Sequence, residues 1–339
     1  MSQLTANSYL LQPRSYPARI SLVIPMYNEE AVVPFLRSTV SQFVSDLPGE
    51  TEVVLVNDGS TDSTVRQIVE WAKQDARVKV VNFSRNFGHQ VALTAGLDYA
   101  TGDVVVTLDA DLQHPLNVIH RMIERYCEGY DVVYGQRKVR PGETWIKKCT
   151  AWLFYRLMRA FIHRDLPVDS GDFRLLSRPC LNGLQQMRET HRFVRGMVAW
   201  VGFPQIGVQY EQAARVAGNT KYTWERMVNF AWTAATSFSI IPLKASTWLG
   251  VIVTLVGLGE AIHALLAKFL HWYVVPGWTS LTVLVSILGG ATLVSIGVLG
   301  EYVGKLYEQT KSRPLYLVSQ TVNIDSSQKS DSKEHPQVV

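Results

Sequence analysis

The sequence predicts an α/β fold: a mostly parallel sheet with helices on both faces, followed by amphipathic interfacial helices and a two-helix transmembrane hairpin. Three observations predict it. Short apolar, strand-like runs alternate with helical segments through about the first 220 residues, as in a doubly wound sheet. Acidic and small polar residues directly follow several of these runs. Two long, almost uncharged stretches come after them.

Each predicted strand is a short apolar run that ends at a polar turn or a helix start. In chain order, the predicted strands are residues 20–24, 52–56, 78–82, 104–108 and 132–134. The first leads into an amphipathic helix, the second into a turn with helix N-cap residues, and the third into a helix from about Gly88. The run Val104 to Leu108 is apolar on both faces, which indicates a buried parallel strand.

The acidic motif Asp109-Ala-Asp111 closes this buried run. Alternate residues of an extended segment point to the same side, so Asp109, Asp111 and, if the chain stays extended, Gln113 project together. Ligands of α/β folds bind outside the carboxyl ends of the strands, and hard oxygen donors suit Mg²⁺ or Mn²⁺ holding a diphosphate. The alternative is a solvated acidic turn before a helix that starts at Pro115. The strand before the motif and the helix after it favour the ligand site.

The hydrophobic share of the 339 residues is 47%, and it rises toward the C-terminus. Residues 243–270 and 278–301 are each long enough for the ~20 residues that span a bilayer. We therefore expect six parts: an N-terminal extension (1–19), an α/β domain (20–221), an amphipathic juxtamembrane helix (222–242), two transmembrane helices (243–270 and 278–301) and a tail (302–339).

Basic residues flank the two expected spans, while the connector 271–277 is short and uncharged. These flanking residues are Lys221, Arg226, Lys244, Lys305, Lys311 and Arg313. By the positive-inside rule, the α/β domain and both termini lie in the cytoplasm, which predicts a multi-pass protein of the cytoplasmic membrane.

Charge and cysteine content narrow the possible partners. The net charge is +4, but the basic residues border membrane segments and no nucleic-acid motif is present, so we expect contact with lipid and none with nucleic acid. The three cysteines have no paired spacing, which fits a reducing compartment and excludes a disulfide or zinc framework. The polar tail from Ser319 to Val339 lacks aromatic residues and is expected to be disordered.

The membrane-proximal segments carry weaker signals. Aromatic and basic residues interleave over Tyr222 to Ile241, as in a helix that lies among lipid headgroups. Glu260 and His263 lie one helical turn apart in the first span, where a structural polar pair or a contact between chains is preferred over a functional site. The Gly300-x-x-x-Gly304 spacing allows close helix packing, so a homo-oligomer is possible.

Six motifs, in this order, resemble those of family-2 glycosyltransferases that act on polyprenyl phosphates. They are Ile24-Pro-Met-Tyr-Asn-Glu-Glu30, Val56-Asn-Asp-Gly-Ser60, Ser84-Arg-Asn-Phe-Gly88, Asp109-Ala-Asp-Leu-Gln-His-Pro115, Asp169-Ser-Gly-Asp-Phe-Arg174 and Ala217-Gly-Asn-Thr-Lys-Tyr222. The closest resemblance is to the bactoprenol glucosyltransferase group, which is related to dolichol-phosphate mannose synthases. The resemblance implies a GT-A-type, Rossmann-like sheet and covers about residue 20 to beyond Tyr222; the terminal hairpin also fits.

The resemblance also implies roles for individual residues. The nucleotide sugar would be held by Pro25, Tyr27, Glu29, Asp58 and Asp109, the metal by Asp111 and Gln113, and the acceptor phosphate by Arg137, Arg215 and Lys221. Gln212 and Val216 stand where many relatives are expected to have an arginine and an aromatic residue, so the loop around the acceptor departs from the family pattern.

The expected enzyme is a metal-dependent, inverting hexosyltransferase with Asp109, Asp111 and Arg137 at its catalytic centre. It would transfer a hexose to a polyprenyl phosphate such as undecaprenyl phosphate, and glucose from UDP-glucose is the favoured donor sugar. A lipid phosphate is largely ionised near neutral pH, so no carboxylate is needed as a general base. The alternatives are a processive polysaccharide synthase and a non-catalytic nucleotide-binding component of a lipid carrier. The sequence does not determine the sugar, the polyprenyl length or the choice between the two metals.

Overall fold

The computed structural model describes residues 11–137, 170–212, 241–270 and 278–324. Two compact units share the chain. The first holds the α/β domain together with the segment from Arg313 onward, and the second holds the two long C-terminal helices. Arg215, Lys221, the juxtamembrane segment 222–240 and the connector 271–277 lie outside the described residues.

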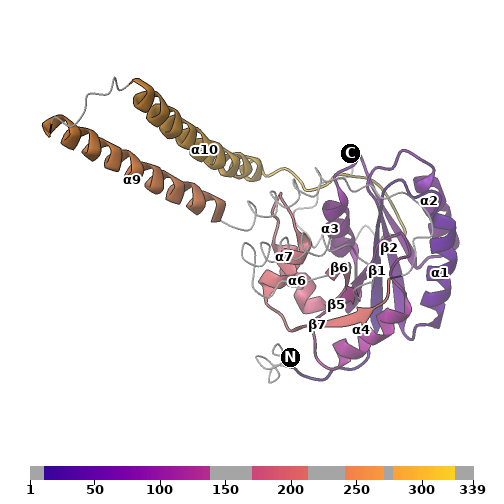
Figure 1. Cartoon of the computed structure of the whole chain (residues 1–339). Helices are drawn as coiled ribbons and strands as arrows, with labels where there is room; N and C mark the ends of the chain where they lie inside the picture. The colour runs from indigo at the N-terminus through magenta and orange to yellow at the C-terminus, as the bar shows by residue number, and fades with distance from the viewer. Residues whose placement is uncertain (1–10, 138–169, 213–240, 271–277, 325–339) are drawn as a thin grey trace. The chain divides into compact units, whose positions relative to one another are not determined.

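The described part of the first unit contains an eight-stranded sheet with the order β7-β5-β6-β4-β1-β2-β3-β8. Figure 1 labels β1, β2, β5, β6 and β7 of this sheet. The strands are β1 Arg19–Met26, β2 Glu50–Asn57, β3 Val78–Phe83, β4 Val104–Thr107, β5 Val132–Arg137, β6 Ser170–Ser177, β7 Gln205–Tyr210 and β8 Val318–Val322. β1 pairs in parallel with β2 and β4, as β2 does with β3 and β5 with β7. β6 is antiparallel to both β4 and β5, and β8 is antiparallel to β3.

The five predicted strands are all present, and the mostly parallel α/β fold is confirmed. Every residue from Ile20 to Met26 and from Val53 to Asn57 is buried. Continuous apolar runs of this kind are expected in strands of a parallel sheet that helices cover on both faces. β6, β7 and β8 were not predicted. β8 corrects one expectation: disorder from Ser319 is wrong for residues 319–322, which continue an edge strand.

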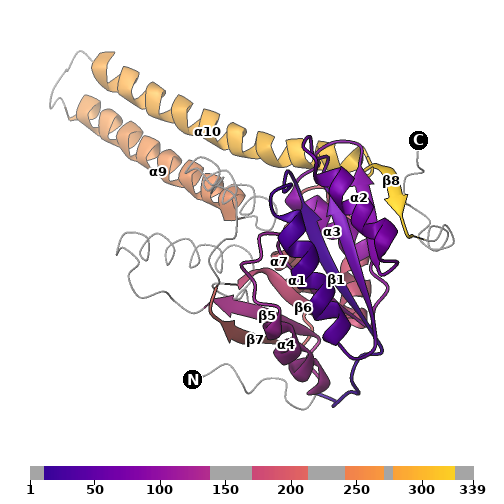
Figure 2. The same cartoon turned by 90° about the vertical axis from the view of Figure 1, so that its right-hand side faces the viewer.

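Helices cover both faces of the sheet (Figures 1 and 2). On one face lie α1 Val33–Asp46, α2 Thr64–Gln74 and α4 Asn117–Cys127, whose apolar residues join the main core cluster. On the other lie α3 His89–Tyr99, α6 Arg178–Gln186 and α7 Val194–Val201. The spacing of apolar residues explains why these helices pack on the sheet: in α4 the buried residues recur every three to four positions and so form one apolar face. Gly96 lets α3 approach β1, since a Cβ there would lie 2.2 Å from Val23 Cγ1.

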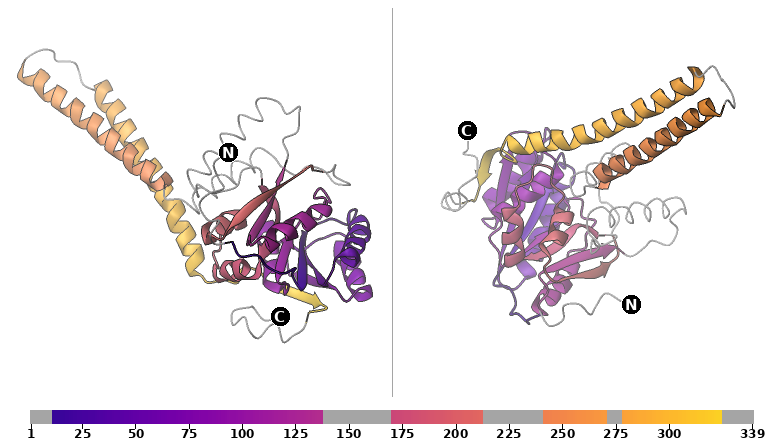
Figure 3. Two further views of the ribbon diagram at one scale, coloured as in Figure 1. Left: turned by 90° about the horizontal axis from the view of Figure 1, so that it is seen from below. Right: turned by 90° about the vertical axis from the view of Figure 1, so that its left-hand side faces the viewer.

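The second unit contains α9 Ile241–Phe269 and α10 Trp278–Thr310, which pack side by side (Figure 3). The Ser295 hydroxyl donates to the Ser246 carbonyl at 3.5 Å between them. Among the described residues, only the segment Ile287–Thr310 is long and apolar enough to cross a membrane, while α9 holds a shorter apolar stretch, Leu243–Gly259. The structure thus provides both helices of the expected hairpin, and the crossing of two spans remains a prediction.

Candidate active site

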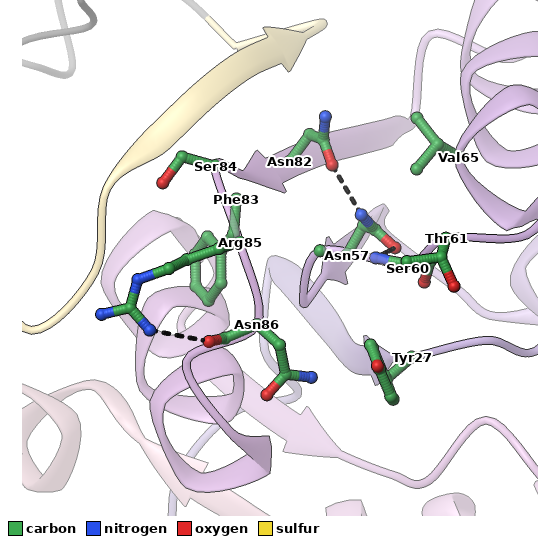
Figure 4. A pocket seen from close by; sticks show the side chains of 11 residues that line it. Tyr27, Asn57, Ser60, Thr61, Val65, Asn82, Phe83, Ser84, Arg85 and Asn86 are labelled. Carbon is green, nitrogen blue, oxygen red and sulfur yellow. Dashed lines mark hydrogen bonds between the residues drawn. The ribbon is translucent and has the colours of Figure 1, made fainter.

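A pocket of about 460 Å³ opens where β1, β2 and β3 end (Figure 4). We call it the strand-end pocket. Its lining comes from the carboxyl ends of these three strands and the residues that follow them: Tyr27, Asn57, Gly59, Ser60, Thr61, Val65, Asn82, Phe83, Ser84, Arg85 and Asn86. The position agrees with the rule that α/β sheets bind ligands outside their carboxyl ends.

Polar side chains give the strand-end pocket its chemistry. The Asn57 amide donates to Asn82 Oδ1 at 2.6 Å, and Asn82 in turn donates to the Ser319 hydroxyl of β8 at 3.1 Å. Tyr27, directly after β1, is 38% exposed where it lines the pocket. Of the residues expected to hold a nucleotide sugar, Tyr27 alone lines this pocket. Pro25 is buried within β1, and the Glu29 backbone N–H donates to Thr64.

Asp58 lies behind the wall of the pocket, because it is only 3% exposed and does not belong to the lining. Its carboxylate accepts hydrogen bonds from the backbone N–H groups of Phe87 at 2.6 Å and Gly88 at 3.0 Å. Burial raises the pKa of Asp58, although these two amides favour its charged form. Gly59 has φ +65°, and a Cβ there would lie 2.3 Å from the Arg85 carbonyl carbon. Asp58 and Gly59 therefore fix the 85–88 loop that walls the pocket.

The acidic motif follows β4 at the same edge of the sheet. Asp111 Oδ1 accepts a hydrogen bond from the Gln113 backbone N–H at 3.1 Å across Leu112, whose φ is +56°. The Gln113 side-chain oxygen accepts from Gln212, the residue that departs from the family pattern. His114 Nε2 lies 3.1 Å from Asp109 Oδ2.

The donor set of this motif fits a hard divalent cation in part. Two carboxylates and an amide oxygen are the donors that Mg²⁺ and Mn²⁺ accept, and Mg²⁺ commonly takes only one or two protein carboxylates beside substrate phosphates and water. No group of three or more His, Cys, Asp or Glu side chains suited to a metal occurs in the described ranges. The residues thus fit an ion held jointly with a bound diphosphate.

Asp172, near the start of β6, is a buried carboxylate whose ionic partners beside the acidic motif are partly exposed. It accepts hydrogen bonds from Arg195 Nε at 2.9 Å and Gln90 Nε2 at 3.1 Å, and His89 Nε2 lies 3.3 Å away. Burial would raise the pKa of Asp172, but the charge of Arg195 and the His89 contact outweigh it and hold that pKa well below 3.8. Asp172 is therefore a charged residue that other residues already neutralise.

His89 lies between two carboxylates, with Nε2 3.8 Å from Asp109 and 3.3 Å from Asp172. The His89 side chain is 47% exposed. Partial burial opposes its charged form, yet the hydrogen bond and the charge of Asp172 outweigh this effect and raise the pKa of His89 above 6.5. Burial likewise opposes ionisation of Asp109, but the His114 hydrogen bond and the charge of His89 lower its pKa. The two carboxylates therefore favour the protonated form of His89 beside the acidic motif.

Arg137 ends β5 and is the register partner of Tyr210 on β7. Its Nε lies 3.4 Å from the Tyr210 hydroxyl. The strand order places three features along one edge of the sheet: the strand-end pocket at β1 to β3, the acidic motif at β4 and Arg137 at β5. Arg215 and Lys221, the other two expected phosphate contacts, lie outside the described residues.

Sequence reasoning gave no role to four residues that the structure places at this edge: His89, His114, Arg195 and Tyr210. His114 belongs to the recognised motif Gln113-His-Pro115, which could have pointed to it. Tyr210 carried no sequence signal, because its contribution depends on the pairing of β7 with β5.

A doubly covered, mostly parallel sheet with a strand-end pocket, an acidic motif and Arg137 on one edge is the arrangement in which α/β enzymes bind ligands beyond their strand ends. Comparison with known proteins agrees: residues 21–184 match the model of Glycosyl transferase family 2. Over 300 residues the chain is 43% identical to an uncharacterized glycosyltransferase of Synechocystis, covering 88% of this chain and 94% of that one. The chain belongs to glycosyltransferase family 2, in the bactoprenol glucosyl transferase group.

Relatives named for a specific activity match the chain over a similar length. It is 39% identical over 300 residues to the prophage bactoprenol glucosyl transferase homolog of Escherichia coli, covering 88% of this chain and 98% of the relative. It is 38% identical over 303 residues to the bactoprenol glucosyl transferase of Shigella phage SfII, covering 89% and 98%. Among solved structures, a mannosyltransferase from Pyrobaculum calidifontis in complex with GDP-Man and Mn²⁺ aligns with 84% of this chain and 89% of its own, at 16% identity and a TM-score of 0.46.

Proposed function

We propose that this enzyme transfers a hexose, glucose from UDP-glucose in the first instance, to a polyprenyl phosphate at the cytoplasmic face of the membrane. The observation that carries the proposal is the order of groups along the sheet edge: pocket, acidic motif, then Arg137. The similarity to relatives named bactoprenol glucosyl transferases supports glucose as the sugar and a polyprenyl phosphate as the acceptor.

The strand-end pocket would hold the nucleoside, with Tyr27 against the base and the Asn57–Asn82 pair offering polar contacts. Asp58 acts through the 85–88 loop in this arrangement, because its own oxygens are occupied by loop amides. The diphosphate would then extend toward the β4 end. There Asp111 and Gln113 would hold Mg²⁺ or Mn²⁺, which when bound offsets the charge of the diphosphate and of the departing nucleotide.

Asp109 is the residue that would contact the donor sugar. Its oxygen Oδ2 is held by His114, so Oδ1 faces the donor side near His89. On the acceptor side, Arg137 would bind the lipid phosphate. A cation is needed there because the phosphate and the donor diphosphate are both anionic and would repel each other.

In the transfer step, an oxygen of the lipid phosphate forms a bond to the anomeric carbon from the face opposite the diphosphate. The bond from that carbon to the diphosphate oxygen breaks, and its electron pair leaves with the nucleoside diphosphate. The attacking phosphate oxygen is already ionised, since the second pKa of a phosphate monoester is ~6. Asp172 is not required as a base: its pKa is well below 3.8, far from the value that suits proton transfer near neutral pH.

The return of the chain to the sheet supports a two-span topology. The chain leaves the sheet after β7 and rejoins it as β8, so an even number of membrane crossings must lie between Tyr210 and Val318. Ile287–Thr310 is one candidate crossing. α9 would supply the second, because its 29 residues at ~1.5 Å each exceed the ~30 Å of a bilayer core. We therefore propose a multi-pass protein with the α/β domain and both helix flanks in the cytoplasm.

The test is a screen of nucleotide sugars against undecaprenyl phosphate with the purified full chain, in which the lipid product is identified by mass. Formation of one polyprenyl-phosphate hexose with equimolar nucleoside diphosphate is the expected result. A lipid-linked polymer would instead indicate a processive synthase. Nucleotide binding without release of nucleoside diphosphate on addition of the lipid would indicate a non-catalytic carrier component.

A further inference from the structure

A buried hydrogen-bonded path joins Asp109 to Arg137 beneath the active-site edge. His114 Nε2 lies 3.1 Å from Asp109 Oδ2, and His114 Nδ1 lies 2.9 Å from the Tyr210 hydroxyl. The same hydroxyl lies 3.4 Å from Arg137 Nε. Three contacts thus connect the carboxylate expected at the donor sugar with the guanidinium expected at the acceptor phosphate.

Every hydrogen bond of this path has one donor and one acceptor if donation runs from Arg137 through Tyr210 and His114 to Asp109. Arg137 can only donate and an ionised Asp109 can only accept. With its proton on Nε2, His114 donates to Asp109, and its Nδ1 accepts from the Tyr210 hydroxyl. The Tyr210 oxygen then accepts from Arg137 Nε. Each contact has one donor and one acceptor, and no polar group of His114 is left unsatisfied.

The path lies in the core, where polar groups are costly. His114 is 2% exposed and Tyr210 3%, and both rings pack against Phe173, which is fully buried. Buried polar side chains are tolerated only when hydrogen-bonded, and apolar residues of similar volume often stabilise a core more. A purely structural need at this place would be met by apolar side chains.

The backbone around the path is also shaped for it. A Cβ at Gly135 would lie 2.9 Å from Tyr210 Cε1 and 2.7 Å from Phe173 Cδ1, so a side chain there would displace both rings. Gly135 belongs to β5 two residues before Arg137, and the bare backbone lets the Tyr210 ring cross to reach His114.

We propose that His114 and Tyr210 are positioning residues that set the geometry between the two substrates. The path holds the Asp109 carboxylate and the Arg137 guanidinium by one atom each, so that their other polar atoms can contact the substrates. His114 occupies Asp109 Oδ2 and leaves Oδ1 for the donor sugar, while Tyr210 occupies Arg137 Nε and leaves the two terminal nitrogens for the acceptor phosphate. The path thereby fixes the line along which the phosphate approaches the anomeric carbon. This inference rests on the proposed function for the identity of the two substrates.

The experiment uses variants that cut the path at one end only, in the full chain in detergent. The amide of His114→Gln can reach the position of Nε2 and keep the Asp109 end, whereas that of His114→Asn can reach the position of Nδ1 and keep the Tyr210 end. Tyr210→Phe keeps the ring and removes the hydroxyl. Tyr130→Phe, which lies two residues before β5 begins and outside the path, is the matched control for this change. Donor and acceptor affinities are measured by direct binding of UDP-glucose and undecaprenyl phosphate, together with kcat.

The expected result is a split between the two substrates. Tyr210→Phe and His114→Gln weaken acceptor binding about tenfold, the factor of one modest hydrogen bond, and change donor affinity less than about twofold. His114→Asn does the reverse. All three lower kcat, because the misplaced group is needed at the reacting centre. In an Arg137→Lys background, which lacks Nε, Tyr210→Phe has no further effect on acceptor binding.

Two outcomes overturn the inference. Equal weakening of both substrates in all three variants, in step with lower thermal stability, would mean a structural role only. Unchanged affinities and kcat would mean that the path is unused. The Arg137→Ala variant tests the proposed function separately from this inference. An unchanged affinity for the lipid phosphate in that variant would show that Arg137 is not part of the acceptor site, whatever the other variants show.

Discussion

Replacing Asp172 with Asn separates a structural carboxylate from a catalytic base. Asp172 is 7% exposed and is surrounded by Arg195, Gln90 and His89, all of which present nitrogen to it. The amide keeps the shape but removes the charge, and its NH₂ group then faces other donors. Breaking a fully buried ion pair costs about 3–5 kcal/mol. Because the Arg195 side chain is 30% exposed, we expect about 2–3 kcal/mol here.

This loss predicts a melting temperature about 4–12 °C lower, since a domain of about 200 residues shifts by ~2–4 °C per kcal/mol. Asp98→Asn is the matched control, because the Asp98 side chain is only 2% exposed and accepts hydrogen bonds from Arg188 at 2.8 Å and from Tyr316 at 2.9 Å. Neither of these partners belongs to the acidic motif. Both variants should lose similar stability. Turnover per folded molecule should stay within about tenfold of the parent in Asp172→Asn and be unchanged in Asp98→Asn.

The stability difference between parent and Asp172→Asn should also depend on pH. The pKa of Asp172 is lowered, so its contribution is present above its unfolded value of 3.8 and is lost as the pH falls through the folded pKa. The pKa of His89 is raised, so its contribution is full below 6.5 and is lost as the pH rises through the folded pKa. The difference should therefore be largest between about pH 4 and 6.5 and smaller above that window. Unfolding curves across pH measure it.

One kinetic pattern would show that Asp172 acts as a general base. If Asp172→Asn stays folded and binds both substrates normally, but turnover falls ~1000-fold and the residual rate rises with pH, a general base is required. The ionised lipid phosphate would then not be sufficient as the attacking group, and the proposed transfer step would be wrong.

Four further predictions follow from the site and the chain topology. Asp111→Asn should abolish metal-dependent transfer in a folded protein, because the amide lacks the charge that holds a divalent ion; near-normal turnover over a metal titration would contradict it. Gly59→Ala should weaken UDP binding at least tenfold, since its Cβ would lie 2.3 Å from the Arg85 backbone; unchanged binding calorimetry would show that the 85–88 loop is not needed. Arg137→Ala should raise the KM for lipid phosphate at least tenfold with little change for the donor, as initial rates against each substrate will show. A reporter inserted near Pro276 should be external and one at the C-terminus cytoplasmic; the reverse labelling would invert the topology.

Much of the fold could be read from local patterns. The five predicted strands appear as β1 to β5 because an apolar run between turn residues favours one local conformation whatever surrounds it. The acidic motif after β4 could be predicted for the same reason, since a strand and the turn after it fix which side chains project together. Tyr27, which the motif predicts to hold the nucleotide sugar, lines the strand-end pocket, and its role there stays a prediction.

The role of Asp58 shows where local patterns stop. Its motif predicts a carboxylate at a strand end, but the structure gives its oxygens to the amides of Phe87 and Gly88, about 30 residues away in the chain. The hydrogen-bond donors of a buried carboxylate come from the loop that folds against it. This loop lies elsewhere in the sequence, so the motif alone does not predict it. β8 is a similar case, because the segment from Ser319 is polar and becomes a strand only by pairing with β3.

The sequence by itself determined the class of fold, the acidic motif and the two apolar helices, because each depends on neighbours within one or two turns of chain. The tertiary structure decided which groups meet. β6 enters the sheet antiparallel between β4 and β5, which brings Asp172 beside His89, and β7 brings Tyr210 to His114 across 96 residues. Such contacts exist only after strands distant in sequence have paired, since burial then requires each polar group to find a partner in the new surroundings.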